Sequence, residues 1–153
     1  MEKQQIAALY ESYGEDVYRL ALSWLHNTHD AEDVLQNVFL KLLDKDVTVF
    51  SGAQKAWLLK CTANACKNHL RSFWQRNTQA LDDHITLPAN EDRSLWEALG
   101  QLKPAYRAVI HLYYYEGYRQ DEIAQILGIS RTAVQTRMQR ARESLKKELE
   151  TNG

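Results

Sequence analysis

The chain has 153 residues, of which 44% are hydrophobic and 25% are charged, as expected for one globular domain or two small ones. It contains only 2 Pro and 6 Gly, which disfavours an all-β fold with many turns and favours helices. Without an apolar run of about 18 residues or a recognisable signal peptide, we expect a cytoplasmic protein that does not insert into a membrane.

The net charge of −1 does not by itself indicate nucleic-acid binding, but the charges are unevenly distributed. Residues 1–51 carry four basic and nine acidic side chains, whereas residues 52–77 carry five basic side chains and no acidic one. We therefore expect separate acidic and basic surfaces with different partners. Cys61 and Cys66 point in different directions on a helix, so we expect free core thiols rather than a disulfide or metal site.

Apolar residues at spacings of three and four predict a helix from Gln4 to Leu25, which Gly14 could interrupt. After a polar break at residues 26–29, Asp30 is placed to cap a second helix that runs to Leu43. Its predicted outer face is rich in acids and amides and comprises Glu32, Asp33, Gln36, Asn37 and Lys41. Such a face can be simply solvated, or it can bind a partner.

A metal site is a rival interpretation of the same region. Its ligands would be His26, His29, Asp30, Glu32 and Asp33. The two histidines fall in a predicted loop, and no further His or Cys lies at a ligand spacing. We therefore expect no metal and no cofactor.

Residues 44–54 lack helical periodicity and are predicted to form a loop, after which a helix is predicted from Ala56 to Arg76. One side of this helix forms a basic and amide ridge of Lys60, Asn64, Lys67, Arg71 and Gln75. Basic groups neutralise phosphates, and an aromatic plane such as Trp74 can stack on an unpaired base. The ridge therefore suits single-stranded nucleic acid, although aromatic residues are more often buried.

The next stretch, up to Arg93, is acidic, contains Pro88 and reads as a linker. A second helical region then begins at Ser94, with Pro104 in the first turn of a helix that places Val109, Leu112 and Tyr113 inside. His111 has no accompanying nucleophile or carboxylate pattern, so we predict a core residue and no catalytic residues.

Residues 118–145 predict a helix-turn-helix. Gly128 ends the first helix, Ile129 fills the turn and Ser130 caps the second helix. In that helix Val134, Met138, Ala141 and Leu145 share a buried face. The exposed face is rich in Arg, Gln and Thr, which bind phosphates and base edges in a major groove. A solvated helical hairpin is the plainer interpretation.

The sequence DEIAQILGIS, followed by RTAVQTRMQRARESL, resembles the DNA-binding region of bacterial sigma factors of the sigma-70 family, extracytoplasmic-function group. In that family this hairpin reads the minus-35 promoter element. The resemblance assigns this role to Arg131, Thr132, Gln135, Thr136, Arg137, Gln139 and Arg140. Gln135 stands where the family usually has Lys, and Arg119 stands where Ser or Thr usually caps the first helix.

Two further stretches resemble the same family. DAEDVLQNVFLKL is similar to its polymerase-binding helix, which implies that core RNA polymerase contacts Asp30, Glu32, Asp33, Gln36 and Asn37. AWLLKCTANACKNHLR is similar to its minus-10 helix, which implies contacts to single-stranded minus-10 DNA from Lys60, Asn64, Lys67, Asn68, Arg71 and Trp74. Asn37 stands where Glu is usual, and Asn68 where Asp is usual.

The resemblance covers nearly the whole chain and implies an all-α fold of two small helical domains joined by a flexible acidic linker. The expected divisions are a polymerase-binding and minus-10 domain (1–76), a linker (77–93) and a minus-35 domain (94–153), with little fixed contact between the domains until both bind. The implied function is a non-enzymatic transcription initiation factor, without a small-molecule substrate, whose partners are core RNA polymerase, promoter DNA and an anti-sigma factor.

Two alternatives to this function stay open on the sequence alone. The first is a stand-alone helix-turn-helix regulator whose N-terminal half senses a signal or dimerises. The second is a helical metal-dependent hydrolase built on residues 26–33. Co-migration with core polymerase would separate the first alternative from a sigma factor.

Overall fold

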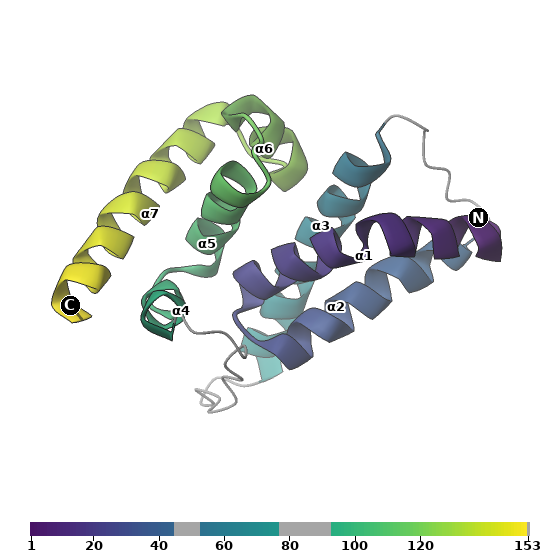
Figure 1. Ribbon diagram of the computed structural model, residues 1–153, viewed down its shortest axis with the longest axis horizontal. Coiled ribbons are helices and arrows are strands. Elements are labelled where there is room, and N and C mark those ends of the chain that lie inside the picture. Colours follow the sequence, from purple (N-terminus) through teal and green to yellow (C-terminus); the bar gives the residue numbers. More distant parts are fainter. Residues whose placement is uncertain (45–52, 77–92, 153) are drawn as a thin grey trace.

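The computed structural model describes residues 1–44, 53–76 and 93–152, and within these ranges the secondary structure is entirely helical (Figure 1). The helices are α1 (Lys3–Leu25), α2 (Thr28–Leu40), the 3-10 turn η1 (Lys41–Leu43), α3 (Gln54–Arg76), α4 (Arg93–Gly100), α5 (Pro104–Ile110), the π-helical turn η2 (His111–Tyr115), α6 (Gln120–Leu127) and α7 (Arg131–Asn152). None of the described helices is long and apolar enough to span a bilayer. Most of the loop predicted at residues 44–54 and of the linker predicted at residues 77–93 falls on residues 45–52 and 77–92, which lie outside the described residues. At their described ends, Gln54 already belongs to α3 and Arg93 to α4.

Helices α1, α2 and α3 pack against one another in an N-terminal group. The predicted apolar stripes supply its core, in which Val17, Leu20, Val38 and Leu58 are at most 2% exposed. Helix α1 runs without a break through Gly14, which does not adopt a positive φ. Cys66 is buried and Cys61 half-buried, and both are free thiols.

The start of α2 corrects the predicted cap. Asn27, in an extended conformation, accepts a hydrogen bond through its side-chain oxygen from the backbone N–H of Asp30 at 3.0 Å. The helix therefore begins at Thr28, and Asp30 lies in its first turn rather than at the cap position. Asn and Asp are almost equally good caps, so the two positions could not be separated by propensity.

Helices α4 to α7 form a C-terminal group in which α5, α6 and α4 each contact α7. Gly128 ends α6 with φ +69°, a conformation that favours glycine, and the Ser130 hydroxyl caps α7 by accepting from the Ala133 N–H at 3.0 Å. Val134 and Met138 are at most 1% exposed. The predicted helix-turn-helix is therefore present with its predicted turn, cap and buried face.

Tyr113 corrects a predicted core residue. It is 36% exposed, and its neighbours Tyr114 and Tyr115 are more exposed still. Leu112, with no exposed surface, fills the core position, so the π-helical turn directs the next three side chains outward. The guanidinium of Arg142 lies over the Tyr113 and Tyr114 rings, 5.7 Å from each centroid.

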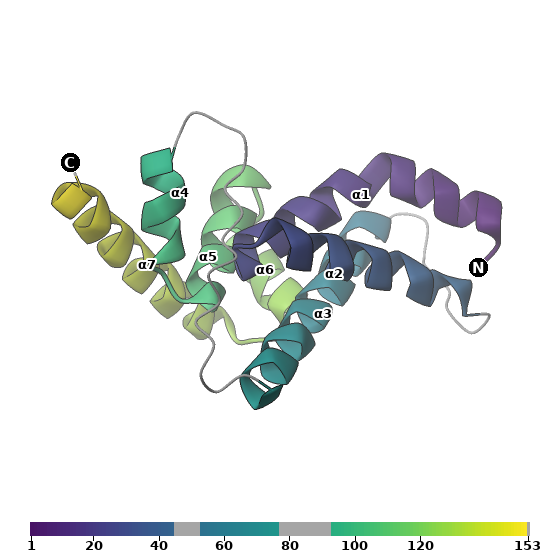
Figure 2. The ribbon, with the colours of Figure 1, turned by 90° about the horizontal axis from the view of Figure 1, so that it is seen from below.

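The two helical groups are in contact, which contradicts the expectation of little fixed contact between them. Helix α1 packs against α5 and α3 against α6 (Figure 2). Buried residues of both groups belong to one continuous core. We call this surface of contact the seam. Hydrophobic periodicity shows that a helix face is buried but not which helix covers it, so the seam could not be predicted from the apolar pattern.

Candidate nucleic-acid and polymerase interfaces

The exposed face of α7 carries most of the residues predicted to read duplex DNA. The first two turns expose Arg131, Thr132, Gln135 and Thr136, and the third exposes Gln139 and Arg140. Arg137 is half-buried, because it lies at the edge of the apolar face that holds Val134 and Met138. Hydrogen-bonding amides and hydroxyls thus lie at the helix start, among guanidinium groups that suit phosphates.

Helix α3 exposes most of the predicted single-strand ridge. Lys60, Asn64, Asn68 and Arg71 are exposed along one side of the helix, whereas Lys67 is half-buried beneath α6. The Nζ atom of Lys67 donates a hydrogen bond to the Leu127 carbonyl at 2.5 Å. Burial, and secondarily the positive charge of Arg137, lowers the pKa of Lys67. The side chains of Trp74 and Gln75 lie outside the described part of the structure, so the stacking role of Trp74 stays a prediction.

Helix α2 exposes Glu32, Asp33, Gln36 and Asn37 on one side, as the sequence predicts. Asp30 behaves differently. It is half-buried, and its carboxylate lies 3.5 Å from Nε2 of His69 on α3. Asp30 therefore joins α2 to α3 as well as bordering the acidic face, and this second role was not predicted.

A groove between α2 and α3 was also missed by sequence reasoning. It has a volume of about 500 Å³, and its polar lining comprises Asn37, Lys41, Asn68, His69 and Ser72. One amide predicted to bind polymerase, Asn37, and one predicted to bind DNA, Asn68, meet in it. No single-helix pattern could bring these two residues together.

The histidines of the rival metal site do not converge with the acids of α2. His26 is buried and its ring stacks on Trp96, whereas His29 is exposed. The described residues contain no group of three or more His, Cys, Asp or Glu side chains that could hold a metal ion.

Comparison with known protein families divides the chain at the same place as the helical groups. Residues 9–76 match the family described as "Sigma-70 region 2", and residues 92–145 match "Sigma-70, region 4". The chain is 30% identical to the RNA polymerase sigma factor SigV of Bacillus subtilis over 147 residues, which cover 91% of this chain and 87% of that protein. It is also 30% identical to the ECF RNA polymerase sigma factor SigL of Mycobacterium tuberculosis, over 99% of this chain and 93% of that protein.

The chain belongs to the extracytoplasmic-function group of sigma-70 family sigma factors. It covers only 59% of the length of another relative, the ECF RNA polymerase sigma factor SigE of Mycolicibacterium smegmatis, which is 29% identical.

Solved structures share the fold of this sigma factor. One is the sigma factor RpoE of Bartonella quintana in complex with the anti-sigma factor NepR, with a TM-score of 0.78, 21% identity and 99% and 98% of the two chains covered. The other is CnrH in complex with the cytosolic domain of CnrY, with a TM-score of 0.63, 24% identity and 99% and 92% covered. The order of regions and the all-α architecture predicted from the sequence are thereby confirmed.

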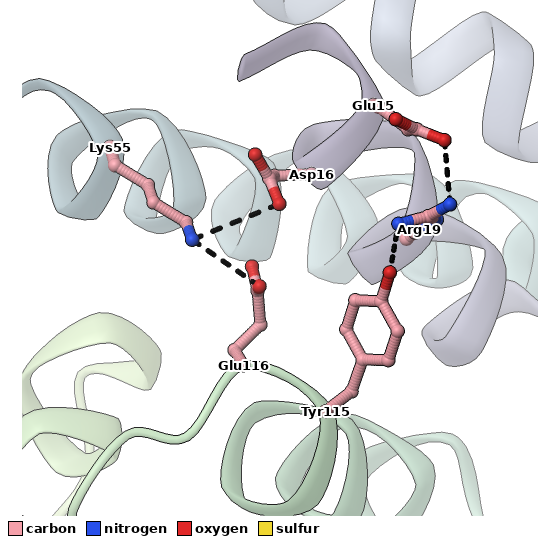
Figure 3. A network of polar contacts seen from close by, with 6 residues as sticks. All are labelled: Glu15, Asp16, Arg19, Lys55, Tyr115 and Glu116. Atoms are coloured by element: carbon pink, nitrogen blue, oxygen red, sulfur yellow. Dashed lines mark hydrogen bonds and ion pairs between the residues drawn. The ribbon is translucent and has the colours of Figure 1, made fainter. Parts of the chain in front are cut away.

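Polar residues of the seam in this sigma factor were missed by sequence reasoning. The Nζ atom of Lys55 on α3 lies 3.3 Å from Oε1 of Glu116 and 3.8 Å from Oδ1 of Asp16 on α1 (Figure 3). Burial lowers the pKa of Lys55, but the two carboxylates outweigh burial and the pKa is raised. Beside this network, Arg19 of α1 donates to the Tyr115 hydroxyl and pairs with Glu15 (Figure 3).

Arg107 is a buried charge in the seam, at 6% exposed. Its guanidinium donates to the carbonyls of Ser23 and Trp24 on α1 and to those of Leu99 and Leu102 in its own group. A lone Arg in the apolar segment AYRAVIHL was a signal in the sequence, because burial of a charge demands several partners.

Proposed function

We propose that this sigma factor divides promoter recognition among three exposed helix faces. The acidic and amide face of α2 docks on core RNA polymerase, the ridge on α3 captures the minus-10 element as single-stranded DNA, and the start of α7 holds the minus-35 duplex. The observation that carries the proposal is that the three kinds of side chain gather on three different helices, and that most of them are exposed opposite the buried stripe of their own helix.

The division of the chain follows the same assignment. We propose that residues 1–76 form the polymerase-binding and minus-10 domain and residues 94–153 the minus-35 domain, with residues 77–93 as the linker. The family matches at residues 9–76 and 92–145 support this division. Helix α4 already includes Arg93, so the second domain and the end of the linker meet at that residue.

On α7, the proposed division of labour follows distance from the helix start. Gln135 and Thr136 offer donors and acceptors to base edges, and Arg131 and Arg140 neutralise phosphates on either side. Glutamine pairs well with adenine in the major groove, whereas the lysine usual in the family favours guanine. We therefore assign an adenine preference to the base that Gln135 contacts.

On α3, the ridge offsets the cost of unpairing. Extruding a base from a duplex costs a few kcal/mol, and stacking of a base on an aromatic side chain returns about 1–3 kcal/mol. Lys60 and Arg71 are exposed near opposite ends of the ridge and can follow the phosphate backbone, while Asn64 and Asn68 can hydrogen-bond bases between them.

On α2, the acidic face supplies the contact to polymerase. The chain itself performs no chemistry in this proposal, because the polymerase forms the phosphodiester bonds, and we place its action in the bacterial cytoplasm, where the polymerase is. RpoE and CnrH, which share the fold, were solved with an anti-sigma factor and with the cytosolic domain of CnrY. By that likeness we propose that an anti-sigma factor also regulates this chain.

Binding to core polymerase and run-off transcription test the proposal together. The template is a promoter selected from a randomised library with the wild-type holoenzyme. We expect Asp33→Lys to weaken binding to core polymerase at least about tenfold, because it reverses a charge in the proposed contact. Glu11→Lys is the matched control, since it reverses another exposed acid, on α1. Equal binding by both variants would contradict the assignment of α2.

A further inference from the structure

The groove between α2 and α3 has the size of a small-molecule site. Its volume of about 500 Å³ falls within the range typical of ligand pockets in proteins. Apolar side chains in its lining are Val34, Leu40 and Ala65. Leu40 is 59% exposed, so a ligand that covers it removes apolar surface from water. The groove therefore combines a suitable volume with apolar area that a ligand can bury.

Charged side chains mark the two ends of the groove. At one end, the Asp30 carboxylate lies 3.5 Å from Nε2 of His69, which lines the groove. At the other end, Lys41 of η1 and Lys60 of α3 both lie near Cys61. Burial raises the pKa of the Cys61 thiol, and the positive charges of the two lysines oppose that rise. The groove thus runs from a His–Asp pair towards a pair of lysines.

Hydrogen-bonding side chains lie between these ends. Asn37 of α2 and Asn68 of α3 are both exposed, and each amide offers donors beside an acceptor. An asparagine amide pairs with adenine through N6 and N7 of the base. None of the described residues that line the groove is acidic, and Lys41 supplies a positive charge. The groove therefore suits a planar base that is joined to an anionic group.

On α3, the groove lies beside the minus-10 ridge and not along it. The groove side of the helix carries Ala65, Asn68, His69 and Ser72. The ridge side carries Lys60, Asn64, Lys67 and Arg71. At 3.6 residues per turn, the centres of these two sets lie about a third of a turn apart round the helix. A single strand whose phosphates follow the ridge therefore leaves the groove to a separate ligand.

We propose that the groove binds a free adenine mononucleotide. The base lies between Asn37 and Asn68, and the phosphate lies towards Lys41 and Lys60. The ligand is not transformed, and it is neither a substrate nor a cofactor. The chain thereby carries a small-molecule site in addition to its polymerase and DNA surfaces.

Occupation of the groove has a regulatory consequence, which rests on the proposed function of α2 and α3. A nucleotide held there covers Asn37, which is assigned to polymerase, and Asn68, which is assigned to minus-10 DNA. At about nine times its dissociation constant, a fully competing nucleotide weakens polymerase binding about tenfold. The groove would then couple promoter use to the concentration of free nucleotide. Binding of the nucleotide itself does not depend on this consequence and is tested without polymerase.

Isothermal titration calorimetry of the full chain with adenosine monophosphate measures binding directly. We expect one site with a dissociation constant below about 1 mM. Adenosine should bind at least about threefold more weakly, because it lacks the phosphate that faces the lysines. Uridine monophosphate should also bind at least about threefold more weakly, because its base lacks N6 and N7. Lack of saturable binding by adenosine monophosphate would overturn the proposal, and so would affinities that do not differ among the three compounds.

Asparagines on neighbouring turns of α3 locate the site. Asn37→Ala and Asn68→Ala should each weaken binding of adenosine monophosphate about tenfold, the effect of losing one good pair of hydrogen bonds. Asn64→Ala is the matched control, because Asn64 is exposed one turn before Asn68 but does not line the groove. All three side chains are exposed, and alanine is a good helix former, so the variants should fold. Equal losses of affinity in Asn64→Ala and Asn68→Ala would contradict a site in the groove.

A mixed-sequence single-stranded 12-mer, measured by fluorescence anisotropy, distinguishes a free nucleotide from one within DNA. Asn37→Ala should leave binding of the 12-mer unchanged, whereas Arg71→Ala should weaken it and leave binding of adenosine monophosphate unchanged. If Asn37→Ala loses affinity for both ligands, the groove receives a base of the strand, and a free nucleotide is ruled out. If Arg71→Ala binds the 12-mer normally while Asn37→Ala still loses adenosine monophosphate, the groove is supported and only the assignment of the minus-10 ridge fails.

Discussion

Two side-chain oxygens begin the helices that carry the proposed polymerase and minus-35 faces. Asn27 starts α2, and Ser130 starts α7, each by accepting a hydrogen bond of 3.0 Å from a backbone N–H three residues later. The first turn of a helix leaves four N–H groups without helical partners, so each cap fixes where its helix begins. For α7 the cap also fixes the register in which Gln135 and Thr136 face outward.

At Ser130 we predict a loss of stability on removal of the cap. Ser130→Ala should lower the free energy of unfolding by about 1 kcal/mol, because one N–H of α7 loses its acceptor. Urea denaturation followed by circular dichroism measures the change. Ser12→Ala serves as the control, since Ser12 is exposed in the interior of α1 and alanine is a good helix former. An equal loss of unfolding free energy in the two variants would contradict the assignment of Ser130 as the cap of α7.

Single residues also show where sequence reasoning succeeds and where it stops. Ser130 follows Gly-Ile in a turn of fixed length, so its role could be predicted. Asn27 and Asp30 are both good caps three residues apart, and nothing local decides between them. Arg107 was not identified, although its apolar surroundings in the sequence hinted at burial. Its partners could not be predicted, because they are carbonyls of Ser23 and Trp24, more than 80 residues earlier, and carbonyls carry no signature in the sequence.

At the scale of elements, the exposed face of α7 changes in composition along the helix. Its early turns mix amides and hydroxyls with Arg131, and from Ala124 to Arg142 all charged side chains are arginines. Base recognition and phosphate neutralisation therefore fall on different positions of one helix. The two contributions differ in their dependence on salt, because only phosphate contacts release counterions.

This difference predicts distinct outcomes for two substitutions on α7. Arg140→Ala should weaken binding to all duplexes and reduce the slope of log K against log salt by about 0.9. Gln135→Ala should relax the preference at one base pair, costing about 1–3 kcal/mol for the preferred sequence, and leave the slope unchanged. Anisotropy titrations at several salt concentrations, with a duplex selected from a randomised pool, measure both.

Lys146→Ala controls for a general loss of positive charge. Lys146 is exposed on α7, but it lines an apolar groove of about 640 Å³ with Leu95, Leu99 and Leu149, well beyond the first turns of the helix. Its removal should leave both the slope and the sequence preference unchanged. A slope that falls equally for Lys146→Ala and Arg140→Ala would show that α7 contributes only diffuse charge.

Helices were predicted well because their evidence is local. The stripes that bury Val17, Val38, Leu58 and Met138 were visible at helical spacing, and each of these residues lies in the core. The ends of helices were less accurate, as the 3-10 turn at Lys41–Leu43 shows, because the apolar pattern continues through it to Leu42. Exposure of Tyr113 was missed for a similar reason, since the π-helical turn breaks the spacing on which the prediction rested.

For the whole molecule, the seam is the feature that the sequence did not reveal. It joins Lys55 of α3 to Glu116, Arg107 of α5 to the end of α1, and Lys67 of α3 to Leu127. The sequence around each of these side chains describes only its own helix. Its partner lies in the other group, so the contact appears only once the two groups are packed. Lys67 was therefore assigned to DNA without its second partner being foreseen.

Two histidines make the stability of the whole molecule depend on pH. Burial, and secondarily Arg107, lowers the pKa of His26 to about 4, and burial with nearby Arg19 and Lys55 lowers the pKa of His111 to about 4. Unfolded histidine has a pKa near 6.5, so the unfolded chain binds more protons between those values. Stability is therefore fully present above about pH 6.5 and is lost as the pH falls towards 4.

When the pH falls from 7 to 5, each of these two histidines should lower the free energy of unfolding by on the order of 2 kcal/mol. Replacing His26 by Phe keeps an aromatic ring to stack on Trp96 but removes the imidazole, whose protonation in the unfolded chain favours unfolding. Between the two pH values, the free energy of unfolding of the variant should fall by roughly 2 kcal/mol less than that of the wild type, as urea denaturation at both pH values would show. Because carboxylates titrate in both proteins, their effect cancels in the comparison. An identical loss in the two proteins would mean that protonated His26 is tolerated where it stands, and that the seam does not exclude charge at this position.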